Sequence, residues 1–285
     1  MRQAVRRWLT GAGTAAAVGA VVLGGAAQSG AATIGAASRS DRANPATTAQ
    51  LTGSAHEAAR AARAYKPSGH VIRYGQSGPA VRAMQRRLAT LHYYPGKVDG
   101  QFGQNTLEAV WAFKEIQKLG PSRDPNDVGL AFQRRLVHPR IPKPVWPRGR
   151  HHAYLIDVNQ NIEALVLFHN GKVVLISHVS SGGRYYYPCG GDPSQTCGPA
   201  ITPDGKYQAN WFAKGWLTVP LGTMYNPVFF IGGSYAIHGD IPVPLAAVSH
   251  GCVRIPMDIA GFFHKLIPIS EKAGKGADIY IWGRT

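Results

Sequence analysis

Apolar residues recur at helical spacing in two stretches of the first half of the chain. In the first stretch, which follows Gly78-Pro79, these residues are Val81, Met84, Leu88 and Leu91. In the second stretch, which follows a helix cap at Asn105 or Thr106, they are Leu107, Val110, Trp111 and Phe113. Each series would line one face of an α-helix, and a glycine-punctuated turn at 95–103 joins the two. We therefore predict a small all-α domain at 70–119.

Short apolar runs rich in Val, Ile, Leu and Phe dominate the second half of the chain. They cover 153–157, 162–168, 172–179, 228–231, 235–238 and 277–282. Turn residues separate several of these runs, most clearly at Asn170-Gly171, a pair that is typical of a β-hairpin. Residues 257–266 have helical character instead. We predict a mainly β domain with one minor helix at 151–285.

The start of the chain lacks the apolar residues that a folded core needs. Residues 1–32 have the pattern of an export signal, with arginines, then an Ala/Gly/Val/Leu run, then small residues. Cleavage of this signal and its retention as an anchor both fit the pattern. Residues 33–69 are rich in Ala, Ser, Thr and Arg, so we predict a disordered tether.

A second segment without a clear core lies between the two predicted domains. Residues 120–150 are rich in proline, and we predict a stiff linker there. An apolar interlude at 130–137 fits one further short helix. With such a spacer between them, we expect the two domains to fold independently.

Composition adds that the chain is strongly basic, with a net charge of +16. In an intracellular protein this excess would point to nucleic acid. With an export signal, we expect no nucleic-acid partner and instead anionic cell-wall polymers or lipid headgroups. Because no long basic run is present, it stays open whether the scattered charges only keep the surface soluble. We expect a monomer.

The strongest chemical signal lies at 237–255, around Cys252. A cysteine nucleophile needs a base, donors for a developing oxyanion and small neighbours. His238 and His250 are the candidate bases. Gly251 leaves room for a substrate carbonyl, so that its N–H and that of Cys252 could point at one oxygen. Arg254 is a fixed cation for a substrate carboxylate, and it gives the sulfur an electropositive setting.

Two other interpretations of these residues stay open. His238, Asp240, His250 and Cys252 are residue types that bind zinc, although their spacing is not that of the common zinc sites. Cys252 could also be a small buried hydrophobe, although its Gly, His and Arg neighbours favour a reactive thiol. We expect neither, and therefore no metal and no cofactor.

The order of these residues resembles a known signature. His238-Gly239, a spacer and Ser249-His250-Gly251-Cys252-Val253-Arg254 look like the L,D-transpeptidases of bacterial cell walls, with their YkuD-type catalytic domain. The resemblance implies a β-sandwich in which Cys252 is the nucleophile and His238 is the base, its ring held by the carbonyl of Gly239. Ser249, His250, Gly251 and Arg254 would line the oxyanion and substrate site. Asp240 departs from the small or hydroxyl residue that is usual in the family.

The resemblance also implies a reaction. Cys252 would form a thioester with a peptidoglycan stem peptide, and an amine of a neighbouring stem would take the acyl group to give a 3→3 cross-link. Carbapenems would be covalent inhibitors. Three alternatives stay open: an L,D-carboxypeptidase that hydrolyses the same thioester, a zinc peptidase, and a non-catalytic wall-binding protein. The segment 202–207 also resembles the family, although a Pro-Asp-Gly turn is a sufficient reason for it.

The helical region resembles a peptidoglycan-binding domain of the three-helix type. The matching residues are Gly75, Gly78, Val81, Gln85, Leu88, Asp99, Gly100, Phe102, Gly103, Thr106, Ala109, Val110 and Phe113. Residues of this kind could equally form the core and turns of any small bundle. The resemblance implies glycan binding, which a shared fold does not guarantee.

The other two cysteines, Cys189 and Cys197, bracket a loop rich in Gly, Pro and Ser that can bury little apolar surface. In an exported chain, three cysteines suggest one pair and one free thiol. We predict a Cys189–Cys197 disulfide, which would contribute about 2 kcal/mol by limiting the entropy of the unfolded loop.

Overall fold

The computed structural model of the 285-residue chain describes residues 65–120, 124–146, 153–189 and 192–283. The predicted export signal lies outside these residues, as does most of the predicted tether. Among the described residues, no helix is long and apolar enough to cross a membrane.

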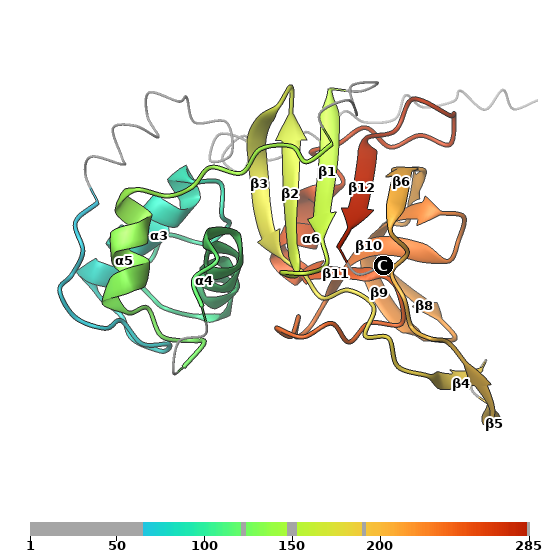
Figure 1. The fold of residues 1–285 in the computed structure, drawn as a ribbon, viewed down its shortest axis with the longest axis horizontal. Coiled ribbons are helices and arrows are strands. Elements are labelled where there is room, and N and C mark those ends of the chain that lie inside the picture. The colour runs from blue at the N-terminus through green and yellow to red at the C-terminus, as the bar shows by residue number, and fades with distance from the viewer. Residues whose placement is uncertain (1–64, 121–123, 147–152, 190–191, 284–285) are drawn as a thin grey trace, which may run out of the picture. The chain divides into compact units, whose positions relative to one another are not determined.

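Three helices form the first domain: α3 (Pro79–Thr90), α4 (Gln104–Gln117) and α5 (Leu130–Val137) (Figure 1). Helix α3 begins at a proline because the first turn of a helix leaves backbone N–H groups without partners in any case. The apolar stripe of α3 faces inward, and Val81, Met84 and Leu88 are at most 2% exposed. The prediction of a small all-α domain with three helices is confirmed.

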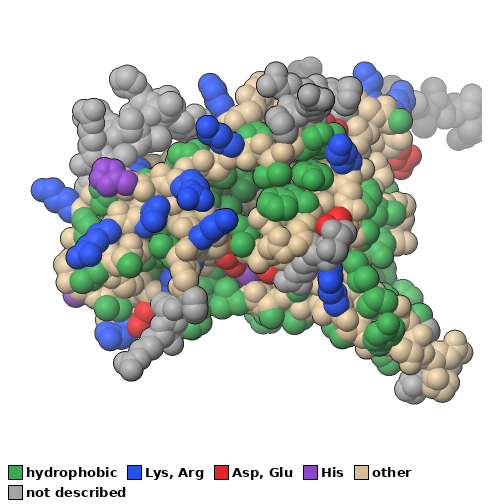
Figure 2. Space-filling view, viewed as in Figure 1, with side chains coloured by type: hydrophobic (Ala, Val, Ile, Leu, Met, Phe, Trp, Pro, Cys, Tyr) green, Lys and Arg blue, Asp and Glu red, His purple; other side chains and the backbone are tan. Residues whose placement is uncertain are grey.

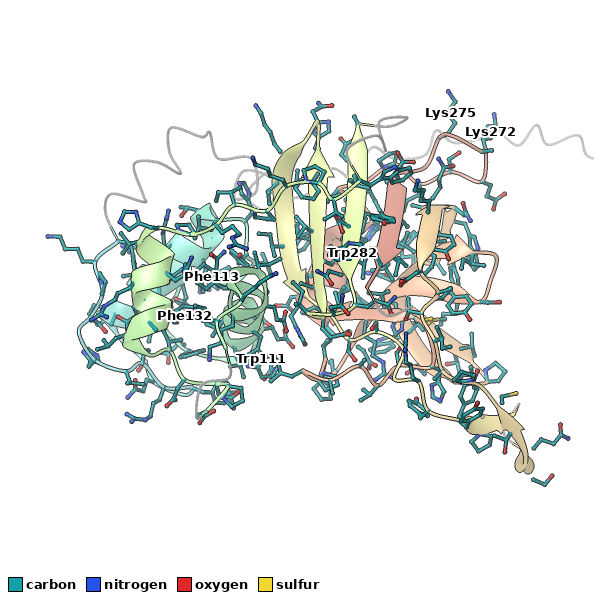
Figure 3. All side chains as sticks on the ribbon, viewed as in Figure 1. Trp111, Phe113, Phe132, Lys272, Lys275 and Trp282 are labelled. Carbon is teal, nitrogen blue, oxygen red and sulfur yellow. The ribbon has the colours of Figure 1, made fainter. Side chains whose placement is uncertain are left out.

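The third helix comes from the segment predicted to be a linker. Phe132 of α5 packs against Phe113 of α4, with ring centroids 4.7 Å apart (Figure 3). Gln133 is fully buried, and its Oε1 accepts a hydrogen bond from the backbone N–H of Ser68 at 2.7 Å. Tyr65 also belongs to this core. The helical domain therefore extends past both of its predicted ends, because two helices alone would leave their shared apolar face uncovered.

The side chain of Gln85 stabilises the turn between α3 and α4. Its Nε2 donates to Asp99 Oδ1 at 3.1 Å and to Thr106 Oγ1 at 3.0 Å, and its Oε1 accepts from the Gly100 N–H at 2.7 Å. All four residues belong to the motif that resembles a peptidoglycan-binding domain. Each of them thus has a role in holding this turn, separate from any contact with glycan.

Two five-stranded sheets build the second domain (Figure 1). The first has the order β3-β2-β1-β12-β6, with strands β1 (Tyr154–Asn159), β2 (Ala164–His169), β3 (Lys172–His178), β6 (Gly205–Gln208) and β12 (Asp278–Trp282). The second has the order β11-β10-β9-β7 with β8 paired to β9; its strands are β7 (Trp211–Phe212), β8 (Trp216–Val219), β9 (Gly222–Ile231), β10 (Tyr235–Asp240) and β11 (Val253–Pro256). A separate hairpin joins β4 (Tyr187–Cys189) and β5 (Asp192–Cys197), and helix α6 (Met257–Phe263) follows β11. The prediction of a mainly β sandwich with a minor helix is confirmed.

Buried apolar residues from both sheets form one core. Strands β1 and β2 contribute Ile156 and Leu167, strands β10 and β11 contribute Ile237 and Val253, and α6 adds Phe263. Each of these side chains is at most 1% exposed. Because interior packing is as dense as an organic crystal, this core fixes the positions of β10 and β11, which carry the predicted catalytic residues.

A second core joins the helical domain to the first sheet. Phe168 of β2 and Ile176 of β3 belong to the same buried cluster as Leu88 and Phe113. The Ile176 N–H also donates to the His92 carbonyl at 2.8 Å. Independent folding of the two domains stays a prediction, but in the folded chain they share this buried cluster. Without the helices, an apolar surface of β2 and β3 would be exposed to water, and the two domains form parts of one compact unit.

Basic side chains are scattered over the face of the molecule drawn in Figure 2. Lys and Arg lie there among apolar and uncharged residues and do not merge into one continuous patch. On this face, the distribution fits charges that solubilise the surface better than a basic groove for a polyanion.

Candidate active site

Parallel pairing of β10 and β11 brings the predicted catalytic residues to one surface. His238 pairs with Arg254, and Ile237 pairs with Val253. Because successive side chains of a strand point to opposite faces, Ile237 and Val253 enter the core. His238, Arg254 and the preceding Cys252 take the other face. Residues that are well separated in sequence thus become neighbours across two adjacent strands.

This face opens onto a pocket of about 630 Å³. The predicted site residues that line it are His238, Ser249, His250, Cys252 and Arg254. A pocket of this size suits a small molecule or a segment of a peptide. Among the described residues, no three His, Cys, Asp or Glu side chains lie close enough together to hold a metal ion.

His238 is held in one orientation by its own strand. Its Nδ1 lies 3.0 Å from the carbonyl oxygen of Gly239, which is the contact that the family resemblance implies. A carbonyl only accepts hydrogen bonds, so Nδ1 carries the proton and Nε2 keeps a free lone pair. Burial lowers the pKa of His238, and the Gly239 carbonyl and Asp240 only partly oppose this effect. The imidazole is therefore neutral near pH 7 and able to accept a proton.

Gly239 is needed for its small size as well as for its carbonyl. A Cβ atom at this position would lie 2.7 Å from the Cβ of Ala260 and 3.0 Å from the sulfur of Met257, both on α6. The glycine thus lets α6 pack directly against β10, behind the imidazole of His238.

Cys252 is a free cysteine with a half-buried side chain. Its sulfur lies 3.8 Å from the Ser234 carbonyl oxygen and 4.0 Å from the sulfur of Met224. Burial raises the pKa of Cys252, and the Ala236 N–H and Arg254 lower it only in part. Burial thus works against formation of the thiolate, and the electropositive setting expected from Arg254 offsets this effect only in part.

Ser249 ties the backbone of the nucleophile segment together. Its Oγ donates to the Cys252 carbonyl and accepts from the Gly251 N–H at 3.0 Å. The Gly251 N–H therefore has a side-chain partner in this structure, and its part in an oxyanion site stays a prediction. Gly251 also provides space, since a Cβ there would lie 2.7 Å from the ring of Tyr235, and its φ of 141° suits only glycine.

Thr202 is a site residue that the sequence analysis missed. Its Oγ1 donates to the Gly251 carbonyl at 2.7 Å and accepts from the Gly182 N–H at 2.8 Å. One buried hydroxyl thus connects the loop after β3 to the loop of Cys252. The sequence signal for Thr202 is the segment 202–207, which resembles the family but which a Pro-Asp-Gly turn also explains.

Asp240 and Arg254 form an ion pair at the edge of the pocket. The Arg254 Nε lies 3.0 Å from Asp240 Oδ2, and Asp240 Oδ1 accepts from the Ile241 N–H at 2.8 Å. The prediction that Arg254 is a fixed cation for a substrate carboxylate stays a prediction. In this structure, the carboxylate of Asp240 offsets part of its charge.

His250 packs against the tyrosines at the mouth of the pocket. Its ring lies edge-on to Tyr187, with centroids 4.7 Å apart, and to Tyr185, with centroids 5.5 Å apart. Burial lowers the pKa of His250, and the Arg254 cation lowers it further. The contacts give His250 a part in shaping the pocket wall.

The hairpin β4–β5 borders the same pocket through Tyr187 and Cys197. The side chain of Cys189 lies outside the description, so the Cys189–Cys197 disulfide stays a prediction. Counting free thiols in denatured, unreduced protein should give one thiol per chain, which would be Cys252. Three free thiols would contradict the pairing.

Comparison with known families identifies both domains. A peptidoglycan binding domain matches residues 77–122, and the L,D-transpeptidase catalytic domain matches residues 153–271. An L,D-transpeptidase from Xylanimonas cellulosilytica is 30% identical in sequence; the alignment covers 76% of this chain and 100% of that chain, with a TM-score of 0.65.

Other similarities are weaker. L,D-transpeptidase 1 from Mycobacterium tuberculosis is 21% identical over 46% of this chain and 62% of its own, with a TM-score of 0.32, which is too low to support an inference. No curated protein matched the chain. With the Xylanimonas similarity spanning both domains, this chain belongs to the L,D-transpeptidase family and carries an N-terminal peptidoglycan-binding domain.

Proposed function

We propose that this protein is a cell-wall L,D-transpeptidase in which Cys252 is the nucleophile and His238 is the general base. The observation that carries the proposal is that His238 on β10 and Cys252, the residue just before the adjacent parallel strand β11, line one pocket. The Gly239 carbonyl holds the Nδ1 proton of His238, so Nε2 is free to take the proton of the thiol.

The first half of the reaction acylates the enzyme. As Cys252 Sγ forms a bond to the carbonyl carbon of a stem peptide, the thiol proton passes to His238 Nε2. The resulting imidazolium then returns this proton to the leaving amine, and the terminal D-amino acid departs. The product is a thioester on Cys252, and the imidazole is neutral again.

The second half transfers the acyl group. An amine of a neighbouring stem attacks the thioester carbon and gives its proton to His238, which returns it to the departing sulfur. In both halves, negative charge develops on the carbonyl oxygen. With the Gly251 N–H bound to Ser249, the N–H of Cys252 is the remaining donor of the predicted pair for this oxygen.

The proposed substrate is the tetrapeptide stem of peptidoglycan, cut after diaminopimelate and joined in a 3→3 link, as the family resemblance implies. The peptidoglycan-binding domain supports a cell-wall setting. Export through residues 1–32 and the net charge of +16, which suits anionic wall polymers, are consistent with it.

An L,D-carboxypeptidase is the second candidate function, because hydrolysis uses the same nucleophile and base with water as the acceptor. The distinguishing experiment is mass spectrometry of the products from defined stem peptides, with and without an amine acceptor. A cross-linked product that depends on the acceptor supports the transpeptidase. Only shortened stems under both conditions would identify a carboxypeptidase.

The nucleophile is tested separately with imipenem, which a solved LD transpeptidase binds. We expect one covalent adduct on Cys252 in the wild type and none in Cys252→Ala, whose fold should be retained. An adduct on another residue, or full turnover by the alanine variant, would contradict the mechanism.

A further inference from the structure

The loop that carries the nucleophile, residues 241–252, connects β10 to β11 and is held along its length by the segment 178–183. Ser180 Oγ donates to the Ala246 carbonyl at 2.8 Å and accepts from the Val248 N–H at 3.2 Å. The placement of Cys252 therefore depends on where the end of β3 and the residues after it lie.

His178, the last residue of β3, contacts this loop from inside the protein. Its side chain is completely buried. Its Nε2 lies 3.0 Å from the Pro244 carbonyl oxygen, and its Nδ1 lies 2.7 Å from Oε1 of Glu115. Glu115 belongs to α4 of the peptidoglycan-binding domain. One buried ring thus connects that domain to the loop of Cys252.

The two contacts fix how protons are distributed around the ring. A carbonyl oxygen cannot donate, so Nε2 of His178 must carry a proton. A second proton lies between Nδ1 and Glu115 Oε1, and with it the pair is electrically neutral as a whole. Removal of this proton would leave a carboxylate facing an imidazole lone pair, both buried, which is unfavourable.

The surroundings keep this second proton in place. Burial raises the pKa of Glu115 to about 7. Burial by itself would lower the pKa of His178, but the carboxylate of Glu115, the Pro244 carbonyl and Glu108 of α4 together raise it. Glu163, which directly precedes β2, also raises the pKa of Glu115. The edge of the Trp111 ring packs on His178, with centroids 5.5 Å apart.

We propose that Glu115 and His178 are positioning residues through which the peptidoglycan-binding domain holds the active-site loop 241–252 in its reactive place. The two residues touch neither substrate nor sulfur and act through the Pro244 carbonyl. The effect on catalysis rests on the proposed function, whereas the effect on the loop does not.

The test uses the full chain with Glu115→Gln, which keeps the shape of the side chain but cannot ionise. The matched control is Glu271→Gln, at an exposed glutamate away from this contact. We expect hydrogen exchange of residues 241–252 to become faster in Glu115→Gln by on the order of tenfold. The maximal rate of Cys252 acylation by imipenem should fall several-fold, with little change in its half-saturating concentration, while the control matches the wild type.

A pH series on the wild type gives a second readout that needs no variant. Between about pH 6 and pH 8 the shared proton is lost, so exchange of 241–252, corrected for the intrinsic effect of pH, should rise. This rise should be absent in Glu115→Gln. Equal hydrogen exchange of 241–252 and equal acylation rates in Glu115→Gln and Glu271→Gln would overturn the proposal. If Glu115→Gln fails to fold, hydrogen exchange of 241–252 that does not change with pH in the wild type would overturn it instead. Failure of imipenem to acylate the wild type would instead count against the proposed function.

Discussion

Two buried histidines serve different ends in this protein because they have different partners. His238 is 4% exposed and His178 is 1% exposed, and each places one ring nitrogen 3.0 Å from a backbone carbonyl. The other nitrogen of His238 keeps its lone pair and is the one that we propose accepts a proton, while that of His178 faces the carboxylate of Glu115. Burial lowers the pKa of His238, whereas Glu115 raises the pKa of His178.

The comparison shows that burial by itself does not set the charge of a histidine. A site that must accept a proton needs an imidazole that is neutral and oriented. Burial favours the neutral form of His238, and the Gly239 carbonyl orients its ring. A structural link through a buried histidine needs a hydrogen bond at each ring nitrogen. The carboxylate of Glu115 makes the second bond possible because a proton is shared between it and the ring. The following predictions test how far the two roles can be separated.

The largest effect is expected from His238→Ala. Without the general base, acylation of Cys252 should slow by roughly two to four orders of magnitude. Stopped-flow measurement with imipenem gives this rate. The free energy of unfolding should change much less, because the ring makes one hydrogen bond within its own strand. If His250→Ala causes the larger loss, the roles of the two histidines are reversed.

His178→Ala should lower the free energy of unfolding more than it slows acylation of Cys252. Removing one partner of a buried pair leaves Glu115 alone, and we expect a loss of about 3 kcal/mol in the free energy of unfolding. Urea denaturation measures it, with His70→Ala at an exposed position as the control. A loss no larger than that of the control would show that the pair contributes little.

The same pair predicts a pH dependence of stability. The unfolded chain has ordinary pKa values of about 4.3 for Glu and about 6.5 for His, whereas both are raised in the folded protein. The folded state therefore binds more protons, so stability should fall as the pH rises above the ordinary value for Glu and through the raised value for His178. Glu115→Gln should flatten this fall, and an unchanged slope in that variant would assign the proton to another group.

Ser249→Ala should have an intermediate effect. It removes the acceptor of the buried Gly251 N–H and the donor to the Cys252 carbonyl, which should cost about 1 to 3 kcal/mol in stability. Acylation should slow as well, because the backbone at Cys252 loses its support. Thermal unfolding and imipenem kinetics measure the two effects, and Ser270→Ala is the matched control. Normal acylation in Ser249→Ala would contradict a positioning role for this hydroxyl.

Asp240→Ser should have the smallest effect on stability, because the ion pair with Arg254 is partly exposed and worth less than about 1 kcal/mol. The larger effect of Asp240→Ser should be on the binding of stem peptides. With Arg254 released, KM should fall a few-fold for a stem with a free carboxylate and stay constant for the amidated stem. Equal changes for both stems would show that Arg254 does not bind that carboxylate.

Features that depend on neighbours along the chain were predictable from sequence. The stripe of Val81, Met84 and Leu88 specified a helix, because the 3.6-residue period places these side chains on one face. The Asn170-Gly171 pair specified a two-residue hairpin between β2 and β3, and both residues have the positive φ that such a turn requires. The contact of His238 with the Gly239 carbonyl was also expected, since the two residues are adjacent.

Sequence by itself therefore determined the helices, the hairpins, the order of the two domains and which residues are candidates for the chemistry. Only the tertiary structure decided that α5 completes the helical domain, that Asp240 pairs with Arg254, and that Glu115 meets His178. The physical reason for this division is that helical periodicity and turn formation depend on residues that are close together along the chain. A contact between distant segments exists only after the cores have packed, when burial determines which polar groups must find a partner.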